Sequence, residues 1–502
     1  LPYGLFLYDD SMSLDTKPQV WVMTVAWYGV TSTANQSGFA LTELAELTKQ
    51  DFPHAHDILS KNRYVDDVIG GSNSLDEVDT QITQVKATLA AGGFETKYIV
   101  RSGEQPEEAA SSDGASIKVL GYKWTTEDDV LYPGFSELNF NKRRRGIKQP
   151  HPFPVINPED VNTVLENKHV TRRMVISKLA EVWDPIGLWE PYKLQLKIDA
   201  TALNGLPWDA PLDEELQSHW KSRFQEFLQL PGVSADRCII PENAVNPDKM
   251  RLLCVSDAAE SAGGCAIYGS FLLTDGTYSC RLLTSRSKLM SQSVPRNELE
   301  GIRLAAIMAA DLKEALGDLV EEALFFTDST IAMSWIHNTK KRLRLFCLNR
   351  VAEARRLIGL ATDISEGIPL FHIDGTANIA DLLTKPHSLK PPDISRGSPW
   401  QNGLPWMVLS LSDMPVTTYG DLTISTADML NIDAECFSNV AASASAHSIH
   451  IKEDPSLHCN LCISVLETSY RIPLYRCHGP DVQDGHCIKC FCQPESLPLT
   501  IE

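Results

Sequence analysis

The chain has 502 residues, 43% hydrophobic and 22% charged, a composition typical of globular proteins with more than one domain. Its 65 acidic residues outnumber its 45 lysines and arginines, and the resulting net charge of −20 excludes a chain whose whole surface binds nucleic acid. No stretch has the apolar length of a membrane helix, and the start, LPYGLFLYDD, has neither a Met nor a signal-peptide pattern, so we expect a piece of a longer protein with no membrane partner.

The first candidate site is a short hairpin with two acids at its tip. A helical pattern through Phe39 to Leu47 precedes the sequence YVDDVIGG at 64–71, in which two apolar arms flank Asp66 and Asp67. An exposed acidic turn is the simple alternative, but paired carboxylates at a hairpin tip also suit divalent cations. YVDD resembles the catalytic hairpin of reverse transcriptases, and this resemblance implies that both Asp bind Mg²⁺ together with a third Asp.

The segments around this hairpin extend the resemblance. WYGVTSTANQSGFALTELAE at 27–46 resembles the template-contacting loop and helix of that family, and LGYKW at 120–124 resembles the hairpin that grips the primer. Between them we expect an amphipathic helix at 75–89 and a strand in GGFETKYIV at 92–100. The third Asp is expected upstream of residue 27, where only Asp9, Asp10 and Asp15 occur. Asp9 and Asp10 follow an apolar run but lie close to the template-loop segment and run straight into a turn, so we expect that the true residue is missing and that polymerase activity requires it to be supplied.

The next segment predicts helices broken by Asp184-Pro185. In TRRMVISKLAEVWDPIGLWEP, at 171–191, we expect apolar and aromatic core positions. The expected core positions are Trp183, Leu188 and Trp189, together with Tyr192 just after this stretch. This stretch is similar to the thumb of polymerases from BEL/Pao long-terminal-repeat retrotransposons. That similarity implies that Arg172, Arg173 and Lys178 contact the template-primer duplex. The alternative is that these residues form a plain helix surface.

Four acids dominate the segment from residue 251 to residue 386. Asp257 and Asp328 each end a short apolar run that reads as a core strand, where an ionised carboxylate needs a partner or a cation. Glu298 begins a helix at about 295–316 and falls on its apolar face with Ile302 and Ala305, whereas Glu300 points away. The fourth acid, Asp381, lies at a helix start in ANIADLLTK.

The order of elements in this segment points to a fold. Strands at 264–271 and 278–285 flank the hairpin signal Thr274-Asp275-Gly276-Thr277, and the order is strand, strand, strand, helix, strand, helix and a final acidic helix. SDAAES, PRNELEG, FTDST and NIADLLTKP resemble the ribonuclease H fold. That resemblance implies two Mg²⁺ ions bound by the four acids, hydrolysis of the RNA strand of RNA-DNA hybrids, and a mobile His at His372 that assists product release.

The motifs together resemble the BEL/Pao polyprotein from about residue 20 to residue 386. We therefore expect an α/β (α+β) multidomain chain: a partial polymerase palm at 1–135, a thumb and connection at 136–245, an RNase H-like mixed-sheet domain at 246–390, and a linker with an irregular Cys-rich tail at 391–502. The resemblance implies template-primer nucleic acid and the remaining polyprotein as partners, and an intracellular setting in cytoplasmic virus-like particles or the nucleus.

The 12 cysteines fall into two groups. Five lie among core-like runs and predict free thiols in a reducing compartment. They are Cys238, Cys254, Cys265, Cys280 and Cys347. In the tail, two CxxC pairs have the spacing of zinc ligands and would suit the start of an integrase; unused cysteines are the alternative. These are Cys459 with Cys462 and Cys487 with Cys490.

Two alternatives to an active enzyme remain from the sequence. One is a decayed or domesticated element that keeps nucleic-acid binding without catalysis. The other is an aspartic peptidase, which is disfavoured because neither Asp-Thr-Gly nor Asp-Ser-Gly occurs.

Overall fold

The computed structural model describes residues 4–7, 19–22, 32–108, 110–111, 113–134, 138–140, 155, 157–166, 168–362, 367–384, 389–437, 482–483 and 486–487. The chain divides into two compact units, Leu1–Phe437 and Ser438–Glu502. In the second unit, the described residues are the short antiparallel strands β14 (Val482–Gln483) and β15 (His486–Cys487). Within the described ranges, no helix is both long and apolar enough to cross a membrane.

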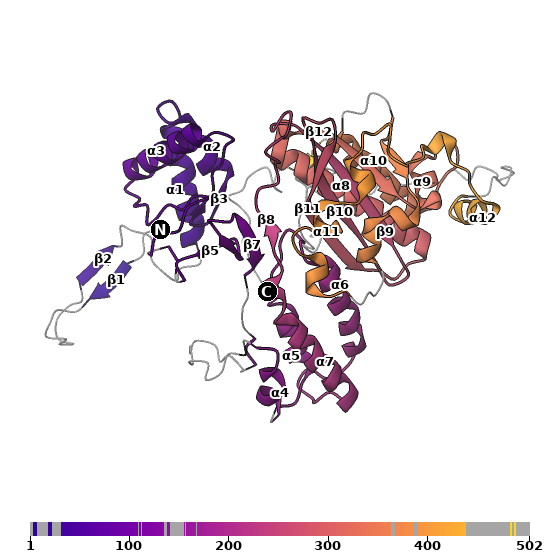
Figure 1. Cartoon of the computed structure of the whole chain (residues 1–502), viewed down its shortest axis with the longest axis horizontal. Helices are drawn as coiled ribbons and strands as arrows, with labels where there is room; N and C mark the ends of the chain where they lie inside the picture. Colours follow the sequence, from indigo (N-terminus) through magenta and orange to yellow (C-terminus); the bar gives the residue numbers. More distant parts are fainter. Residues whose placement is uncertain are drawn as a thin grey trace. The chain divides into compact units, whose positions relative to one another are not determined.

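The N-terminal part combines three helices with short hairpins. Strands β1 (Gly4–Leu7) and β2 (Gln19–Val22) pair antiparallel, and helices α1 (Thr33–Leu47), α2 (Pro53–Lys61) and α3 (Leu75–Ala91) follow (Figure 1). The predicted helices around 39–47 and 75–89 are confirmed by α1 and α3. The strand predicted at 92–100 is wrong: residues 94–101 have no regular structure, and they have no partner strand among the described residues.

The predicted hairpin at LGYKW is present. Strands β5 (Ser116–Val119), β6 (Tyr122–Thr125), β7 (Val130–Pro133) and β8 (Ala235–Asp236) form a four-stranded antiparallel sheet. The turn between β5 and β6 consists of Leu120 (φ 49°) and Gly121 (φ 87°), the left-handed pair that a tight two-residue hairpin needs.

A helical segment joins the two sheets in sequence. It contains α4 (Asp160–Leu165), α5 (Arg172–Leu179), α6 (Glu190–Asp199) and α7 (Glu214–Phe227), with the 3₁₀ turns η1 (Ala200–Leu203) and η2 (Leu230–Gly232). The break at Asp184-Pro185 is confirmed, because α5 ends before it and α6 begins after it. Leu188, Trp189 and Tyr192 are buried as predicted. Trp183 is not: it is 56% exposed, because its indole Nε1 donates to the carbonyl of Leu120 on the hairpin turn (3.0 Å).

A mixed five-stranded sheet forms the centre of the following segment. Its strands are β9 (Met250–Ala258), β10 (Ala262–Leu272), β11 (Tyr278–Leu289), β12 (Val320–Thr327) and β13 (Leu370–His372), in the order β11-β10-β9-β12-β13. β9, β10 and β11 are antiparallel neighbours, whereas β12 runs parallel to both β9 and β13. The predicted hairpin around Gly276 is thereby confirmed as the β10–β11 connection.

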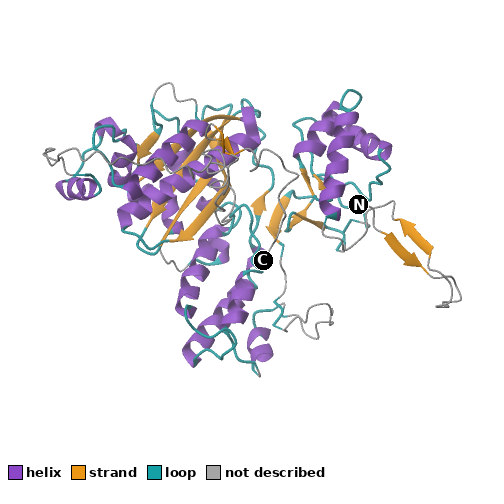
Figure 2. Ribbon diagram, turned by 180° about the vertical axis from the view of Figure 1, so that it is seen from behind, coloured by secondary structure: helices purple, strands orange, loops and turns teal. Residues whose placement is uncertain are grey.

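Helices cover both faces of this sheet, so strand β9 is buried along its whole length (Figure 2). Met250, Leu252 and Cys254 pack with α8 (Val294–Leu316), α9 (Thr330–His337) and α10 (Leu345–Ala361). Leu253 and Val255 point to the opposite face, into the core that includes α6, η5 (Ile379–Leu383) and α11 (Pro399–Asn402). This alternation is the period-two pattern of a strand between two layers.

The described residues beyond 390 pack against the same sheet. They form η6 (Pro391–Ile394), η7 (Pro405–Val408), η8 (Tyr419–Asp421) and α12 (Thr426–Ala434), while η3 (Gly317–Leu319) and η4 (Gly375–Ala377) complete the described helical turns. Trp400 and Met407 are buried in one core, and Ile432 and Cys436 in the other. The domain boundary at 390 stays a prediction, but residues 391–437 are packed structure rather than a loose linker. The five cysteines predicted as free thiols are free, as is Cys436.

Candidate functional site

Two of the four predicted acids lie at the carboxyl ends of neighbouring strands: Asp257 is in β9, and Asp328 directly follows β12. Val255 of β9 is the register partner of Phe326 of β12, and Asp257 and Asp328 each follow two residues later in their segments. Because β9 and β12 are parallel, their carboxyl ends meet at one edge of the sheet. Asp257 is only 8% exposed there, so the strand buries a carboxylate that needs compensation.

Glu298 reaches this edge from the helix packed on β9. Gly301 of α8 lies so close to the strand that a Cβ there would be 3.3 Å from the carbonyl oxygen of Asp257. The Glu298 carboxylate accepts a hydrogen bond from the Ser329 hydroxyl, directly after Asp328 in the chain. The predicted inward orientation is consistent with this contact, and Glu300 turns instead to Arg303 and Arg350.

The fourth acid, Asp381, lies in η5, which two polar side chains attach to the sheet. The Asn378 amide donates to the carbonyl of Ser256 (3.0 Å) and to Asp328 Oδ1 (3.3 Å). The Thr384 hydroxyl donates to Asp257 Oδ2 (2.7 Å) and to the carbonyl of Asp381 (3.1 Å). These bonds place η5 across the ends of β9 and β12.

A glycine makes room for this short helix. At Gly264 of β10 a Cβ would lie 2.6 Å from Leu383 Cβ and 2.7 Å from the carbonyl oxygen of Arg286, both shorter than real contacts. No larger residue therefore fits at this position without displacing η5.

Burial and mutual repulsion raise the pKa values of the acids. Burial, followed by the charges of Asp328 and Asp381, raises the pKa of Asp257 to about 6, against the bond from Thr384. Burial raises the pKa of Glu298 to about 7, with contributions from Asp328, Asp257 and Asp428. Burial also raises the pKa of Asp328. The four acids thus act on one another electrostatically, which a nearby cation would relieve.

The donor set suits Mg²⁺ in chemistry, since hard divalent cations prefer carboxylate oxygens. Among the described residues, however, no three His, Cys, Asp or Glu side chains are arranged so that they could hold a metal ion. The acids share a neighbourhood without ligating geometry, so the four-acid Mg²⁺ site stays a prediction.

His372 lies at the end of β13, beside the acids. Its ring Nε2 is 3.1 Å from the backbone carbonyl oxygen of Asp328, an interaction that requires a proton on Nε2. The strand itself is tied to Thr417 by an isolated bridge. The structure therefore brings His372 to the site, and its role in product release stays a prediction.

Asp66 and Asp67 form a second, different acidic site. Strands β3 (Arg63–Tyr64) and β4 (Asp67–Val68) pair antiparallel, so the predicted hairpin is confirmed and both acids are exposed at its tip. Val65 in the turn has φ 54°, a strained conformation for a β-branched residue. Burial, and then the charge of Asp66, raises the pKa of Asp67. The candidates for a third acid, Asp9, Asp10 and Asp15, lie outside the described residues.

The three predicted nucleic-acid contacts on α5 are engaged within the protein. Arg172 donates to the carbonyl of Leu206 (3.0 Å) and stacks over Trp208, and Arg173 forms a two-bond ion pair with Asp209. Lys178 is 4% exposed and pairs with Glu181 (2.5 Å). Lys178 thus presents no exposed ammonium, and the other two would have to exchange partners to contact a duplex.

Several predicted features fall outside the described residues. They include the side chains of the predicted zinc ligands Cys459, Cys462, Cys487 and Cys490, although the backbone of Cys487 lies in β15. Lys385 and Pro386, which end the NIADLLTKP motif, are also not described.

Sequence reasoning missed the residues that orient the acids. Asn378, Thr384 and Ser329 lie inside the quoted motifs, each within three residues of a predicted acid, and all three are at most 5% exposed. The signal that could have found them is a buried polar side chain close in sequence to an acidic residue, because buried polar groups form hydrogen bonds. Asp428 was missed because it follows the acids by about 50 residues, in a segment without a recognised motif.

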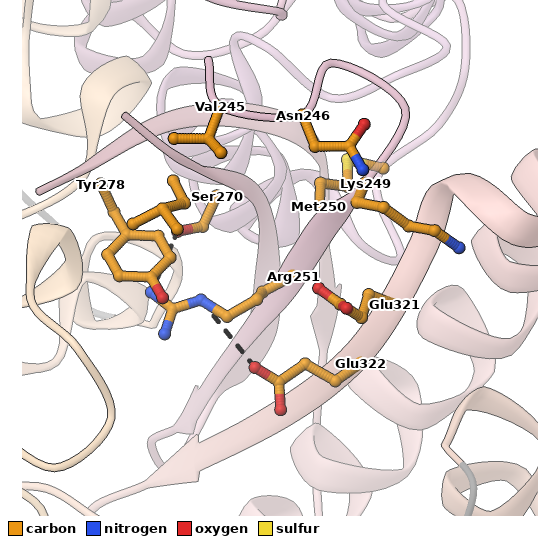
Figure 3. A pocket seen from close by; sticks show the side chains of 10 residues that line it. Val245, Asn246, Lys249, Met250, Arg251, Ser270, Tyr278, Glu321 and Glu322 are labelled. Atoms are coloured by element: carbon orange, nitrogen blue, oxygen red, sulfur yellow. Dashed lines mark hydrogen bonds and ion pairs between the residues drawn. The ribbon is translucent and has the colours of Figure 1, made fainter. Parts of the chain in front are cut away.

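A polar cavity lies near the start of β9, at the opposite end of the strand from Asp257 (Figure 3). It has a volume of about 190 Å³ and is lined by residues that include Arg251, Tyr278 and Glu322. Arg251 lies six positions before Asp257 along the strand, which corresponds to roughly 20 Å. The cavity is therefore separate from the acids, and the Arg251 guanidinium in it is already stacked on Tyr278 (3.5 Å to the ring centroid).

Comparisons with known proteins bear on this region. The family model of the Pao retrotransposon-like RNaseH-like domain matches residues 171–329, which span α5 to Ser329. No curated protein matches the chain. The match covers Asp257, Glu298 and Asp328, whereas Asp381 lies beyond it.

Solved structures similar to the chain include two RNase H proteins and one viral polymerase. RNase H1 from the halophilic archaeon Halobacterium salinarum NRC-1 is 14% identical (TM-score 0.20) and covers 27% of this chain and 93% of its own. The N-terminal RNase H domain of rv2228c from Mycobacterium tuberculosis is 15% identical (TM-score 0.20) and covers 27% and 91%. The foamy viral protease-reverse transcriptase in complex with double-stranded DNA is 13% identical (TM-score 0.39) and covers 72% and 52%. Residues 171–329 are thus similar to the RNaseH-like domain of Pao retrotransposons, in agreement with the motifs quoted from this range.

Proposed function

We propose that the chain is an RNase H-type endoribonuclease that hydrolyses the RNA strand of RNA-DNA hybrids. The observation that supports the proposal is that Asp257 lies at the carboxyl end of β9 and Asp328 directly after the parallel strand β12, while Glu298 of α8 is bonded to Ser329 and the segment carrying Asp381 is bonded to β9. The charge of Asp381 acts on Asp257 and Asp328, and the charges of Asp257 and Asp328 act on Glu298, although a buried carboxylate is costly as an anion.

Two Mg²⁺ ions bound by these acids would supply an activated water and stabilise the leaving 3′ oxygen. Asp257, Glu298, Asp328 and Asp381 are the residues that would hold them. Thr384, Ser329 and Asn378 orient the first three acids, since each donates a hydrogen bond to one carboxylate. His372 is placed beside Asp328 to assist the departure of product.

RNA-directed DNA synthesis is the second part of the proposal and is conditional. Asp66 and Asp67 would provide two of the three carboxylates that a polymerase site needs, and the third must be supplied from elsewhere. We therefore expect nuclease activity from this chain, and primer extension only where a third carboxylate joins Asp66 and Asp67.

A catalytically decayed, nucleic-acid-binding remnant is the competing function. It is favoured by one observation: in the described part of the chain, no three candidate ligands are positioned to hold a metal ion. An aspartic peptidase has no comparable support, because its two characteristic tripeptides do not occur in the sequence.

Cleavage of an end-labelled RNA-DNA hybrid in Mg²⁺ separates these functions. The wild-type chain should release RNA products, and Asp328→Asn should not. Asp311→Asn is the matched control, since it makes the same chemical change at an exposed position on α8. Cleavage by Asp328→Asn at the wild-type rate would contradict the nuclease, and binding of hybrid without cleavage by the wild-type chain would favour the remnant.

A further inference from the structure

An acidic segment lies near Glu298 and near the start of the helix that follows Asp328. Residues 425–437, called the acidic strap from here on, comprise α12 and the turn after it and carry Asp428, Asp433 and Glu435. Ile432 of the strap is buried in the core of α8, α9 and α10, and its carbonyl accepts a bond from Trp335 Nε1 (3.3 Å). Apolar packing therefore holds the strap in place independently of its charges.

Two acids of the strap contact groups that adjoin the candidate site in sequence. Asp428 accepts a hydrogen bond from the hydroxyl of Thr330 (3.0 Å), two residues after Asp328. Glu435 pairs with Arg296 (2.6 Å from Nη2), two residues before Glu298. The strap thus places carboxylates beside α8, which carries Glu298, and beside the start of α9, which follows Asp328.

Asp433 and the aromatic ring of Phe437 contact the basic residues at 340–344. Asp433 pairs with Lys341 (2.5 Å), and the ring of Phe437 lies under the guanidinium of Arg342 (5.2 Å to the centroid). Backbone bonds join the two segments as well, from Phe437 to Arg342 (2.9 Å) and from Arg344 to Glu435 (2.7 Å).

A nucleic-acid strand that approaches four carboxylates needs cations nearby, because its own phosphates are repelled by those acids. Arg296 is on the helix that carries Glu298, and Lys341 and Arg342 are on the loop after α9, the helix that follows Asp328. In a chain of net charge −20, cations in these positions are suited to the phosphates that flank the reacting one.

We propose that Arg296, Lys341 and Arg342 form a phosphate-contacting surface for the substrate strand, and that the acidic strap covers it as an intramolecular competitor. The inference rests on the proposed nuclease function. The carboxylates of Asp433 and Glu435 stand where substrate phosphates would bind, and Asp428 adds a negative charge beside Glu298. Substrate has to displace these side chains before a phosphodiester reaches the acids.

The exposure of the ion pairs indicates how displacement proceeds. The side chains of Lys341 and Asp433 are 47% and 52% exposed, so water and salt screen this pair and a phosphate exchanges with it readily. Arg296 and Glu435 are more enclosed, at 28% and 13%. Asp433 therefore leaves first, while Ile432 keeps the strap attached to the body.

The test compares two variants that each remove three negative charges. The strap variant is Asp428→Asn/Asp433→Asn/Glu435→Gln, and the control is Asp311→Asn/Glu314→Gln/Asp318→Asn, three exposed acids at the far end of α8 and in η3. Both are made in an Asp328→Asn background, and binding of a fluorescently labelled hybrid is measured by anisotropy over a range of salt concentrations. Hybrid cleavage is measured in parallel with the Asp328 carboxylate intact.

We expect the strap variant to bind hybrid about tenfold more tightly than the control at low salt. Its plot of log affinity against log salt should be steeper by about two, because two cations released from ion pairs each add a slope of roughly 0.9. Its cleavage rate at limiting substrate should rise to a similar extent. Equal binding by strap variant and control, or weaker binding by a strap variant with unchanged thermal stability, would overturn the proposal.

A milder change covers the case in which the triple variant does not fold. Asp433→Asn alone alters one half-exposed pair and should steepen the salt dependence by about one; an unchanged slope would overturn the competitor model. Failure of the proposed nuclease is distinguished separately, as absence of hybrid cleavage by both the wild-type chain and the strap variant.

Discussion

The chain contains two pairs of acids whose surroundings are opposite. Asp257 and Asp328 lie at the buried edge of a five-stranded sheet and accept hydrogen bonds from Thr384 and Asn378. Asp66 and Asp67 lie exposed at the tip of a two-stranded hairpin. Within the described residues, no side chain donates a hydrogen bond to either hairpin acid, whereas Val65 beside them has a strained backbone.

The two pairs of acids therefore differ in what opposes their charge and conformation. In the sheet, burial raises the pKa of the acids and neighbouring donors fix their orientation, so the cost is electrostatic. In the hairpin, partial burial and the charge of Asp66 raise the pKa of Asp67, and the left-handed conformation of Val65 adds a cost on the order of 1–2 kcal/mol. Hydrogen bonds from Thr384 and Asn378 orient the sheet acids, whereas no side-chain donor among the described residues orients the hairpin acids.

The first prediction exploits this contrast and has the largest expected effect. Asp257→Asn should lower the rate of hybrid cleavage by about 100-fold or more, since even residues behind a metal ligand affect activity by about 10–100-fold. Asp67→Asn, the same change in the hairpin, should leave hybrid cleavage unchanged. The rates are measured with a labelled hybrid at saturating Mg²⁺. Equal losses in both variants would break the distinction between the two sites.

The second prediction compares glycines in the two regions. Gly264→Ala should lower the free energy of unfolding by about 1–3 kcal/mol, because its Cβ would overlap Leu383 and the backbone of Arg286. Gly71→Ala, after the hairpin, should not show this loss, since nothing lies within 4 Å of its added Cβ. Denaturant unfolding of both variants gives the comparison. An unaffected Gly264→Ala would show that η5 is not packed on β10 as described.

The sequence predicted the strands and the helix that carry Asp257, Asp328 and Glu298, because local signals identify these elements. Apolar runs that end in Asp257 and Asp328 identify buried strands, and the face occupied by Ile302 and Ala305 identifies the inward acid of α8. The family match over 171–329 agrees with this part of the prediction. The order of strands and helices then leaves few arrangements in which these acids do not meet.

The sequence predictions failed where contacts between residues distant in sequence determine the local structure. Residues 92–100 have strand-like composition but find no neighbouring strand among the described residues, and Trp183 is exposed because its indole bonds to a hairpin turn distant in sequence. The strap acid Asp428 approaches Glu298 only through the fold, since about 130 residues separate them. No period or motif encodes such a contact, so it could not be predicted from the sequence.

The third prediction concerns the pH dependence of stability in the absence of Mg²⁺. Burial and neighbouring acids raise the pKa of Glu298 from 4.5 to about 7 in the folded state. Its contribution to stability is therefore fully present below about pH 4.5 and is lost as the pH rises through 7. Between pH 5 and pH 8, wild type should lose roughly 1–3 kcal/mol relative to Glu298→Gln. Thermal or denaturant unfolding at both pH values measures this, and a constant difference between the two proteins would contradict it.

The smallest expected effect tests whether orientation of the sheet acids matters beyond their presence. Thr384→Val removes the hydroxyl that donates to Asp257 Oδ2 (2.7 Å) and keeps the shape of a fully buried side chain. A freely rotating carboxylate holds a cation less well, so half-maximal hybrid cleavage should require about tenfold more Mg²⁺. Thr277→Val is the control, since its hydroxyl binds Asp275 in the exposed β10–β11 turn. An unchanged Mg²⁺ requirement in Thr384→Val would show that burial alone, without this donor, positions Asp257.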